Sequence, residues 1–82
     1  MRSSFGSNEL IKCLRCLGFT KQRSTGSSHE KYSSPNAVAK GTRPFIMVIL
    51  GRKIYDNHTR TSYLRQIRNL GFTTEKITNC MP

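Results

Sequence analysis

A stripe of apolar residues at helical spacing is the first pattern along this 82-residue chain. Residues that recur with a period near 3.6 occupy one face of a helix. The stripe consists of Leu10, Cys13, Leu14 and Leu17. Ser7 or Asn8 is expected to cap this helix, and Gly18 to end it in a left-handed conformation. Residues 1–6 are polar and contain glycine, so a flexible tail is predicted there.

An alternating pattern follows the first helix. Residues 20–24 have the composition of a polar strand, and Thr25-Gly26-Ser27 has that of a turn. In residues 28–33 successive side chains are expected on opposite faces of a strand. One face carries His29, Lys31 and Ser33, and the other carries Ser28, Glu30 and Tyr32. The pattern predicts a β-hairpin with one face in water.

The most apolar segment of the chain lies at residues 45–50, Phe-Ile-Met-Val-Ile-Leu. Its β-branched and aromatic residues predict a strand with apolar side chains on both faces. The segment before it, residues 34–44, contains Pro, Asn, Gly, Lys and Arg without any periodicity. We expect a flexible, basic loop there.

A second helical stripe follows this strand. Thr59 is expected to cap the helix and Gly71 to end it. The buried positions are Tyr63 or Leu64, Ile67 and Leu70, and the outward positions are Arg60, Arg65 and Arg68. The segment Leu-Gly-Phe-Thr occurs at 17–20 and again at 70–73, which we interpret as the same helix-ending device used twice. A last short helix is expected from Thr74.

These elements predict one α+β domain over residues 1–82, in the order helix, three strands, helix and a helical tail. The expected architecture is a three-stranded antiparallel sheet with two helices on one face. Two helices leave the second face open, although strand 45–50 is apolar on both faces. Either this strand is buried more deeply, or its outer face binds a partner, or its edge pairs with another chain.

The charge balance changes this picture. Fourteen Lys and Arg residues against four Asp and Glu residues give a net charge of +10, above the range of about 2–8 that is typical for a small domain. Such an excess favours a polyanionic partner, most commonly nucleic acid, over a surface that is basic only for solubility. No apolar run approaches the roughly 20 residues that span a bilayer, and no signal peptide is evident. We therefore expect a soluble, cytoplasmic protein.

The chain has three cysteines, Cys13, Cys16 and Cys80. The odd number and low density argue against a disulfide framework. Cys13 and Cys16 have the spacing of a metal or redox pair, but they fall within a predicted helix, and the histidines do not complete a zinc-finger spacing. We expect buried thiols, no metal and no cofactor.

His29 is the main candidate for chemistry. The chain has no glycine-rich nucleotide loop, no paired carboxylates and no Ser-His-Asp spacing. An imidazole transfers protons near neutral pH, and RNA can supply its own 2′-hydroxyl as the nucleophile. Lys21, Arg23 and Lys31 are expected near His29 in the hairpin, where they would stabilise charge on a phosphate. The alternative is that His29 is simply an exposed strand residue.

Other candidates carry weaker signals. His58 lies in a polar segment before the second helix and is interpreted as a solvated loop residue. Tyr32 is a candidate for stacking on a base, although core packing is the more common role of a strand tyrosine. The arginines of the second helix either follow phosphates or form a solvated helix face.

Several of these segments together resemble the HicA toxins of toxin–antitoxin systems. They are Glu9-Leu10-Ile11-Lys12, Leu17-Gly18-Phe19, Arg23-x-x-Gly26-Ser27-Ser28-His29, the apolar strand, Tyr63-Leu64-Arg65-Gln66-Ile67 and Leu70-Gly71-Phe72. The resemblance covers residues 7–77. It implies a fold like the double-stranded-RNA-binding domain, and mRNA interferase activity that depends on His29. It also implies a HicB-type antitoxin partner that covers the active-site surface.

The leading hypothesis from the sequence is a type II toxin that cleaves mRNA without a metal and has a single catalytic histidine, His29, which acts as general base or acid. The residues expected to contact RNA are Lys21, Arg23, Gly26, Ser27, Ser28, Lys31, Arg52 and Lys53. One alternative is a non-catalytic RNA-binding module with the same fold. Another is a cytosolic protein-interaction domain that uses the apolar strand.

Overall fold

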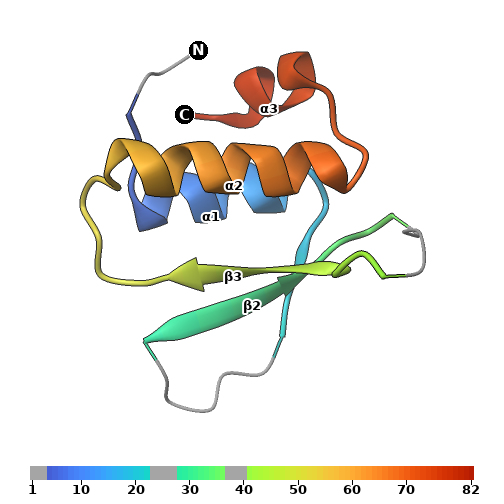
Figure 1. Cartoon of the computed structure of the whole chain (residues 1–82), viewed down its shortest axis with the longest axis horizontal. Coiled ribbons are helices and arrows are strands. Elements are labelled where there is room, and N and C mark those ends of the chain that lie inside the picture. Colours follow the sequence, from blue (N-terminus) through green and yellow to red (C-terminus); the bar gives the residue numbers. More distant parts are fainter. Residues whose placement is uncertain (1–3, 23–27, 37–40) are drawn as a thin grey trace.

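The computed structural model describes residues 4–22, 28–36 and 41–82 (Figure 1). Its elements are α1 (Ser7–Cys16), β1 (Thr20–Lys21), β2 (His29–Ser33), β3 (Phe45–Ile49), α2 (Asn57–Asn69) and α3 (Thr74–Cys80). The strands form one antiparallel sheet in the order β1-β2-β3. The predicted small α+β domain and its order of elements are therefore confirmed, including the final helix that begins at Thr74.

The pairing register decides which side chains face the helices. Tyr32 of β2 lies opposite Ile46 of β3, and Glu30 lies opposite Val48. Tyr32, Ile46 and Val48 are fully buried among the core residues, so Tyr32 is a core residue and cannot stack on a base. In Figure 1 the sheet lies at the bottom, α1 and α2 lie above it, and α3 lies above them. The other face of β3 carries Met47, which is 39% exposed.

Two tyrosine hydroxyls bind the outer edge of β3. The Tyr63 hydroxyl of α2 donates to the carbonyl oxygen of Met47 at 2.8 Å and accepts from the backbone N–H of Ile49 at 2.9 Å. The Tyr55 hydroxyl donates to the carbonyl oxygen of Ile49 at 2.6 Å. Burial raises the pKa of both phenols, which keeps them protonated and able to donate. These contacts occupy backbone groups that an added strand would need, so edge-to-edge pairing at Met47 and Ile49 is blocked.

The prediction of a flexible tail is wrong for residues 4–6, the part of the tail that the structure describes. Phe5 is only 2% exposed, and its ring packs edge-on against Tyr55 with centroids 5.9 Å apart. The carbonyl oxygen of Phe5 accepts a hydrogen bond from the N–H of Tyr55 at 2.8 Å. One large aromatic side chain was enough to bury a segment whose other residues are polar or glycine.

Both predicted helix caps are one to three residues too late. Gly6 caps α1, and its N–H donates to the Glu9 side chain at 2.8 Å. Only glycine fits at this cap, because a β-carbon would collide with the carbonyl oxygens of Arg52 and Lys53. Asp56 caps α2 and accepts hydrogen bonds from the hydroxyl and N–H of Thr59, which lower the pKa of the Asp56 carboxyl. Thr59, the predicted cap, is therefore a residue of the first turn.

The repeated Leu-Gly-Phe-Thr segments behave as predicted. Gly18 and Gly71 have φ values of 95° and 99°, in the left-handed region that follows many helices. Each glycine redirects the chain so that the following phenylalanine enters the core, and the rings of Phe19 and Phe72 lie 5.5 Å apart. The two helix ends therefore meet in space.

The expected flexible loop, residues 34–44, is held at both of its described ends. The N–H of Ser34 donates to the carbonyl oxygen of Pro44 at 2.8 Å. The Asn36 side chain donates to the carbonyl oxygen of Leu70, at the end of α2, at 3.1 Å. Residues 37–40 lie outside the described part of the chain.

The cysteine prediction is wrong for two of the three residues. Cys16 of α1 and Cys80 of α3 form a disulfide across a sequence separation of 64 residues. Cys13 is a buried free thiol, as expected; burial raises its pKa to about 11, and it lies 3.7 Å from the carbonyl oxygen of Ile77. None of the helices within the described residues has the length and apolarity needed to cross a bilayer.

Tyr63→Phe is expected to lower the free energy of unfolding by about 1–3 kcal/mol, because it leaves two backbone groups of β3 without their partner. Urea denaturation measures this loss. Tyr32→Phe is the matched control, since its hydroxyl donates to the Glu30 side chain at 3.1 Å and not to the backbone of β3, so its loss should be smaller. Equal losses in the two variants would contradict the role assigned to Tyr63.

Reduction of the Cys16–Cys80 disulfide is expected to lower the free energy of unfolding by about 2–5 kcal/mol, mainly because the unfolded chain gains freedom. Chemical denaturation with and without a reducing agent measures the difference. A double variant, Cys16→Ser with Cys80→Ser, should have the lower stability and should not respond to the reducing agent. Native protein in which both cysteines react readily with a thiol reagent would contradict the disulfide.

Candidate functional site

A groove of about 340 Å³ runs between the outer face of the sheet and α2. We call it the two-histidine groove. Its lining residues are His29, Arg43, Phe45, Met47, Ile49, His58, Thr59, Ser62, Tyr63 and Gln66. A neighbouring hollow shares Arg43, Phe45 and Gln66 with it and continues along α2 to Asn69. The sheet and α2 thus form the two walls of one elongated depression.

The strand pattern and the helix period supply these walls. His29 lies opposite Ile49, and Lys31 lies opposite Met47, so these residues share the face of the sheet that points away from the core. On α2, residues four apart lie above one another, which places His58, Ser62 and Gln66 along one line of the helix surface. His58 and His29, 29 positions apart in sequence, therefore line the same groove.

His29 is exposed at the start of β2, as the sequence predicted. Its Nδ1 atom lies 3.3 Å from the hydroxyl oxygen of Ser28. The tautomer of the imidazole decides which of the two atoms donates in this contact. Ser28, also predicted as a site residue, is thus placed to influence which ring nitrogen carries the proton.

Two cationic side chains lie on the His29 side of the sheet. The Nζ atom of Lys31 lies 4.1 Å from the centre of the Phe45 ring, a cation–π contact. Arg43 lines the groove directly. No carboxylate is among the residues that line the groove, so within the described chain its charge is positive. The arrangement favours an anionic ligand.

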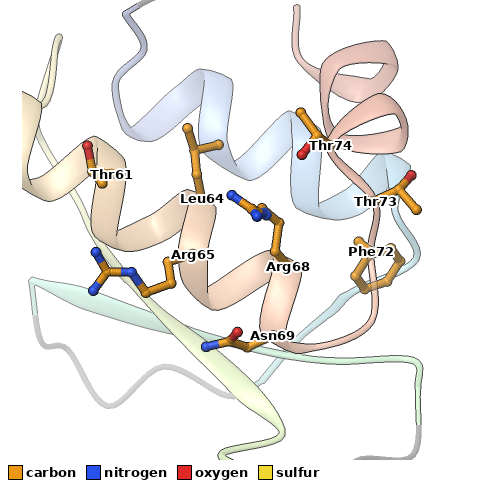
Figure 2. Close-up of a pocket in the computed structure, with 8 residues that line it drawn as sticks. All are labelled: Thr61, Leu64, Arg65, Arg68, Asn69, Phe72, Thr73 and Thr74. Carbon is orange, nitrogen blue, oxygen red and sulfur yellow. The ribbon is translucent and has the colours of Figure 1, made fainter.

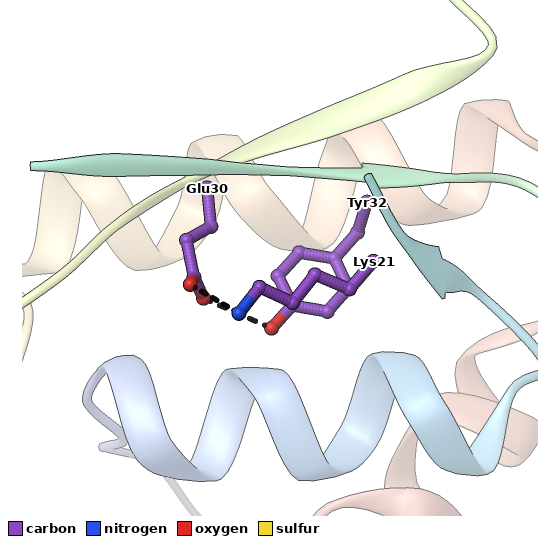
Figure 3. A network of polar contacts seen from close by, with 3 residues as sticks. All are labelled: Lys21, Glu30 and Tyr32. Atoms are coloured by element: carbon purple, nitrogen blue, oxygen red, sulfur yellow. Dashed lines mark hydrogen bonds and ion pairs between the residues drawn. The ribbon is translucent and has the colours of Figure 1, made fainter. Parts of the chain in front are cut away.

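Lys21 does not lie beside His29, contrary to prediction. Lys21 pairs with Tyr32 in the register, which puts it on the helix-facing side of the sheet. Its Nζ atom forms an ion pair with Glu30 at 2.8 Å, and Glu30 also accepts a hydrogen bond from Tyr32 (Figure 3). The Glu30 contact raises the pKa of Lys21, and the Lys21 contact lowers the pKa of Glu30.

The remaining predicted contact residues are not brought into the groove. Arg52 and Lys53 are exposed in the connection after β3, at the end of the sheet where His29 lies, but they are not among the lining residues. The carbonyl oxygen of Arg52 instead accepts from the backbone and side chain of Ser7. Arg23, Gly26 and Ser27 lie outside the described residues.

Comparisons with known protein families, curated proteins and solved structures give no match. The interpretation of the site therefore depends on its own geometry. In the described part of the chain, no three His, Cys, Asp or Glu side chains gather where they could bind a metal ion together.

Sequence reasoning missed the other two basic residues that line the groove, His58 and Arg43. The sequence predicts a solvated loop at His58, but this residue lies in the first turn of α2 because the helix begins at Asn57. The signal that could have found it is Asp56, a strong capping residue that starts the helix earlier than Thr59 does. Arg43 belongs to the loop before β3, where no repeating pattern of apolar residues predicts which way a side chain points.

A second basic hollow lies on another side of α2 (Figure 2). Its lining residues are Thr61, Leu64, Arg65, Arg68, Asn69, Phe72, Thr73 and Thr74, and its volume is about 670 Å³. Arg65 and Arg68 are exposed, as expected for outward positions of the helix. Asn69 lies between this hollow and the groove system on the sheet side.

Lys31→Ala should weaken binding of a single-stranded oligonucleotide and reduce the slope of log K against log salt by about 0.7, the value for one lost phosphate contact. Lys21→Ala is the matched control, because it removes the same charge from the opposite face of the sheet. Fluorescence anisotropy across a salt series measures both. A larger change in Lys21→Ala than in Lys31→Ala would show that the groove face is not the binding surface.

Proposed function

We propose that this protein is a ribonuclease toxin of the HicA kind, which cleaves mRNA without a metal and belongs to a type II toxin–antitoxin pair. The observation that carries the proposal is the position of His29. It lies on the open face of the sheet, in a groove with Arg43 and near Lys31, and without a carboxylate. A proton-transfer group among cations is what RNA cleavage by the substrate's own 2′-hydroxyl requires.

The proposed reaction begins with removal of the 2′-hydroxyl proton by a general base, for which His29 is the candidate. The 2′-oxygen then bonds to the adjacent phosphorus, and the bond from phosphorus to the 5′-oxygen breaks. The products are a 2′,3′-cyclic phosphate and a 5′-hydroxyl. Arg43 and Lys31 stabilise the negative charge that builds on the phosphate oxygens.

The arrangement of the elements supports the finer parts of the proposal. The order helix, three antiparallel strands and helix agrees with the double-stranded-RNA-binding-domain-like fold that the HicA resemblance implies. Met47 and Ile54 are large apolar residues that are 39% and 63% exposed. A HicB-type antitoxin that covers them would also cover the two-histidine groove, which Met47 lines.

A second candidate function is non-catalytic binding of RNA. The hollow around Arg65 and Arg68 favours it, since that surface offers cations and threonine hydroxyls but no group that transfers protons near neutral pH. Such a protein would bind duplex RNA through phosphates and 2′-hydroxyls.

Incubation of the protein with labelled single-stranded mRNA in EDTA tests the proposal. The parent should cleave and leave 2′,3′-cyclic phosphate or 3′-phosphate ends, and His29→Ala, purified identically, should lose activity by about 10²–10⁴-fold. His29 is exposed, so His29→Ala should remain folded, and its unfolding curve checks this. Equal cleavage by both proteins would remove His29 from the chemistry. Binding without cleavage by the parent would favour the RNA-binding module.

A further inference from the structure

We infer that His58 is the second catalytic residue of the two-histidine groove and donates the proton that the leaving 5′-oxygen requires. This inference rests on the proposed ribonuclease function and deepens it. The chain has only two histidines, and α2 and β2 place both in one groove of about 340 Å³. Cleavage of RNA needs two proton transfers, one from the nucleophile and one to the leaving group.

The position of His58 is fixed by the start of α2. Asp56 caps the helix through Thr59, so His58 falls in the first turn and not in the preceding loop. One turn later, the Tyr63 hydroxyl ties α2 to the backbone of Met47 and Ile49. Ile49 in turn lies opposite His29. A short chain of contacts thus links the strand that carries His29 to the helix that carries His58, and both residues line one groove.

Other groups in the groove do not serve as the proton donor. The Tyr63 hydroxyl donates to the carbonyl oxygen of Met47, and burial raises its pKa. The hydroxyl of Ser62 and the amide of Gln66 do not titrate near neutral pH, and the Arg43 guanidinium does not release its proton. No carboxylate lines the groove. Among its lining residues, this leaves His58 to act beside His29.

His29 takes the 2′-hydroxyl proton while the 2′-oxygen bonds to phosphorus. The phosphorus–5′-oxygen bond breaks, and the 5′-oxygen takes a proton from the His58 imidazolium. The products are the cyclic phosphate and the 5′-hydroxyl. His29 then holds an extra proton and His58 lacks one, and exchange with water restores both.

The test uses an RNA in which sulfur replaces the bridging 5′-oxygen at the site that the parent cleaves. A thiolate leaves without protonation, so this substrate does not need the proton donor. His58→Ala should cleave ordinary RNA about 10²–10⁴-fold more slowly than the parent and still bind it. On the sulfur substrate its rate should approach that of the parent, whereas His29→Ala should stay slow. Asn57→Ala is the control for the first turn of α2.

The outcomes separate the two proposals. If His58→Ala cleaves ordinary RNA as fast as the parent, the role of His58 is wrong and the ribonuclease proposal stands. If His58→Ala is equally slow on both substrates, or if His29→Ala is the variant that sulfur rescues, the assignment of His58 as proton donor is also wrong. If the parent cleaves no RNA, the ribonuclease proposal fails and the inference fails with it.

Discussion

The hydroxyl of Tyr63 holds α2 against the edge strand of the sheet, and the two-histidine groove depends on this contact. It satisfies one backbone oxygen and one backbone N–H of β3 at once, so it fixes both the distance and the direction of the helix. Tyr55 adds a hydrogen bond to the carbonyl oxygen of Ile49, the residue whose N–H Tyr63 already binds, and its ring packs against Phe5 in the core. Without these contacts β3 would have an open edge, and the wall that carries His58 would have no fixed position relative to His29.

The few carboxylates of the chain explain how its charge is distributed. Three of the four carboxylates serve local structure. Glu9 and Asp56 bind groups at helix starts, and Glu30 pairs with Lys21 between the sheet and α1. The fourth, Glu75, lies in the first turn of α3. These positions keep the acids away from the groove. In a chain with a net charge of +10, the groove is therefore lined by basic residues without a carboxylate. The positive charge of the groove therefore follows from where the acids are needed.

Local patterns in the sequence predicted local structure well. The apolar stripes gave both long helices, and the alternation of residues 28–33 put His29 on the face opposite Tyr32, as observed. The errors arise where distant segments meet. Cys16 and Cys80 are 64 residues apart in sequence, so no local pattern predicts their disulfide. Lys21 was expected near His29 because a hairpin joins their strands, but only the register decides the face. His58 enters the site through tertiary packing of α2 alone.

The disulfide and the groove lie on different parts of the core. Cys16 and Cys80 join α1 to α3, whereas the groove is built from β2, β3, α2 and the loop residue Arg43. A cytoplasm keeps most thiols reduced, so a cytoplasmic form of this protein would lack the disulfide. The attachment of α3 would then depend on Ile77, which is 1% exposed beside Cys13. The Tyr63 contacts to β3 involve neither cysteine. The contacts that place α2 beside β3 are therefore independent of the disulfide, so reduction is expected to lower the stability of the fold rather than to rearrange the groove.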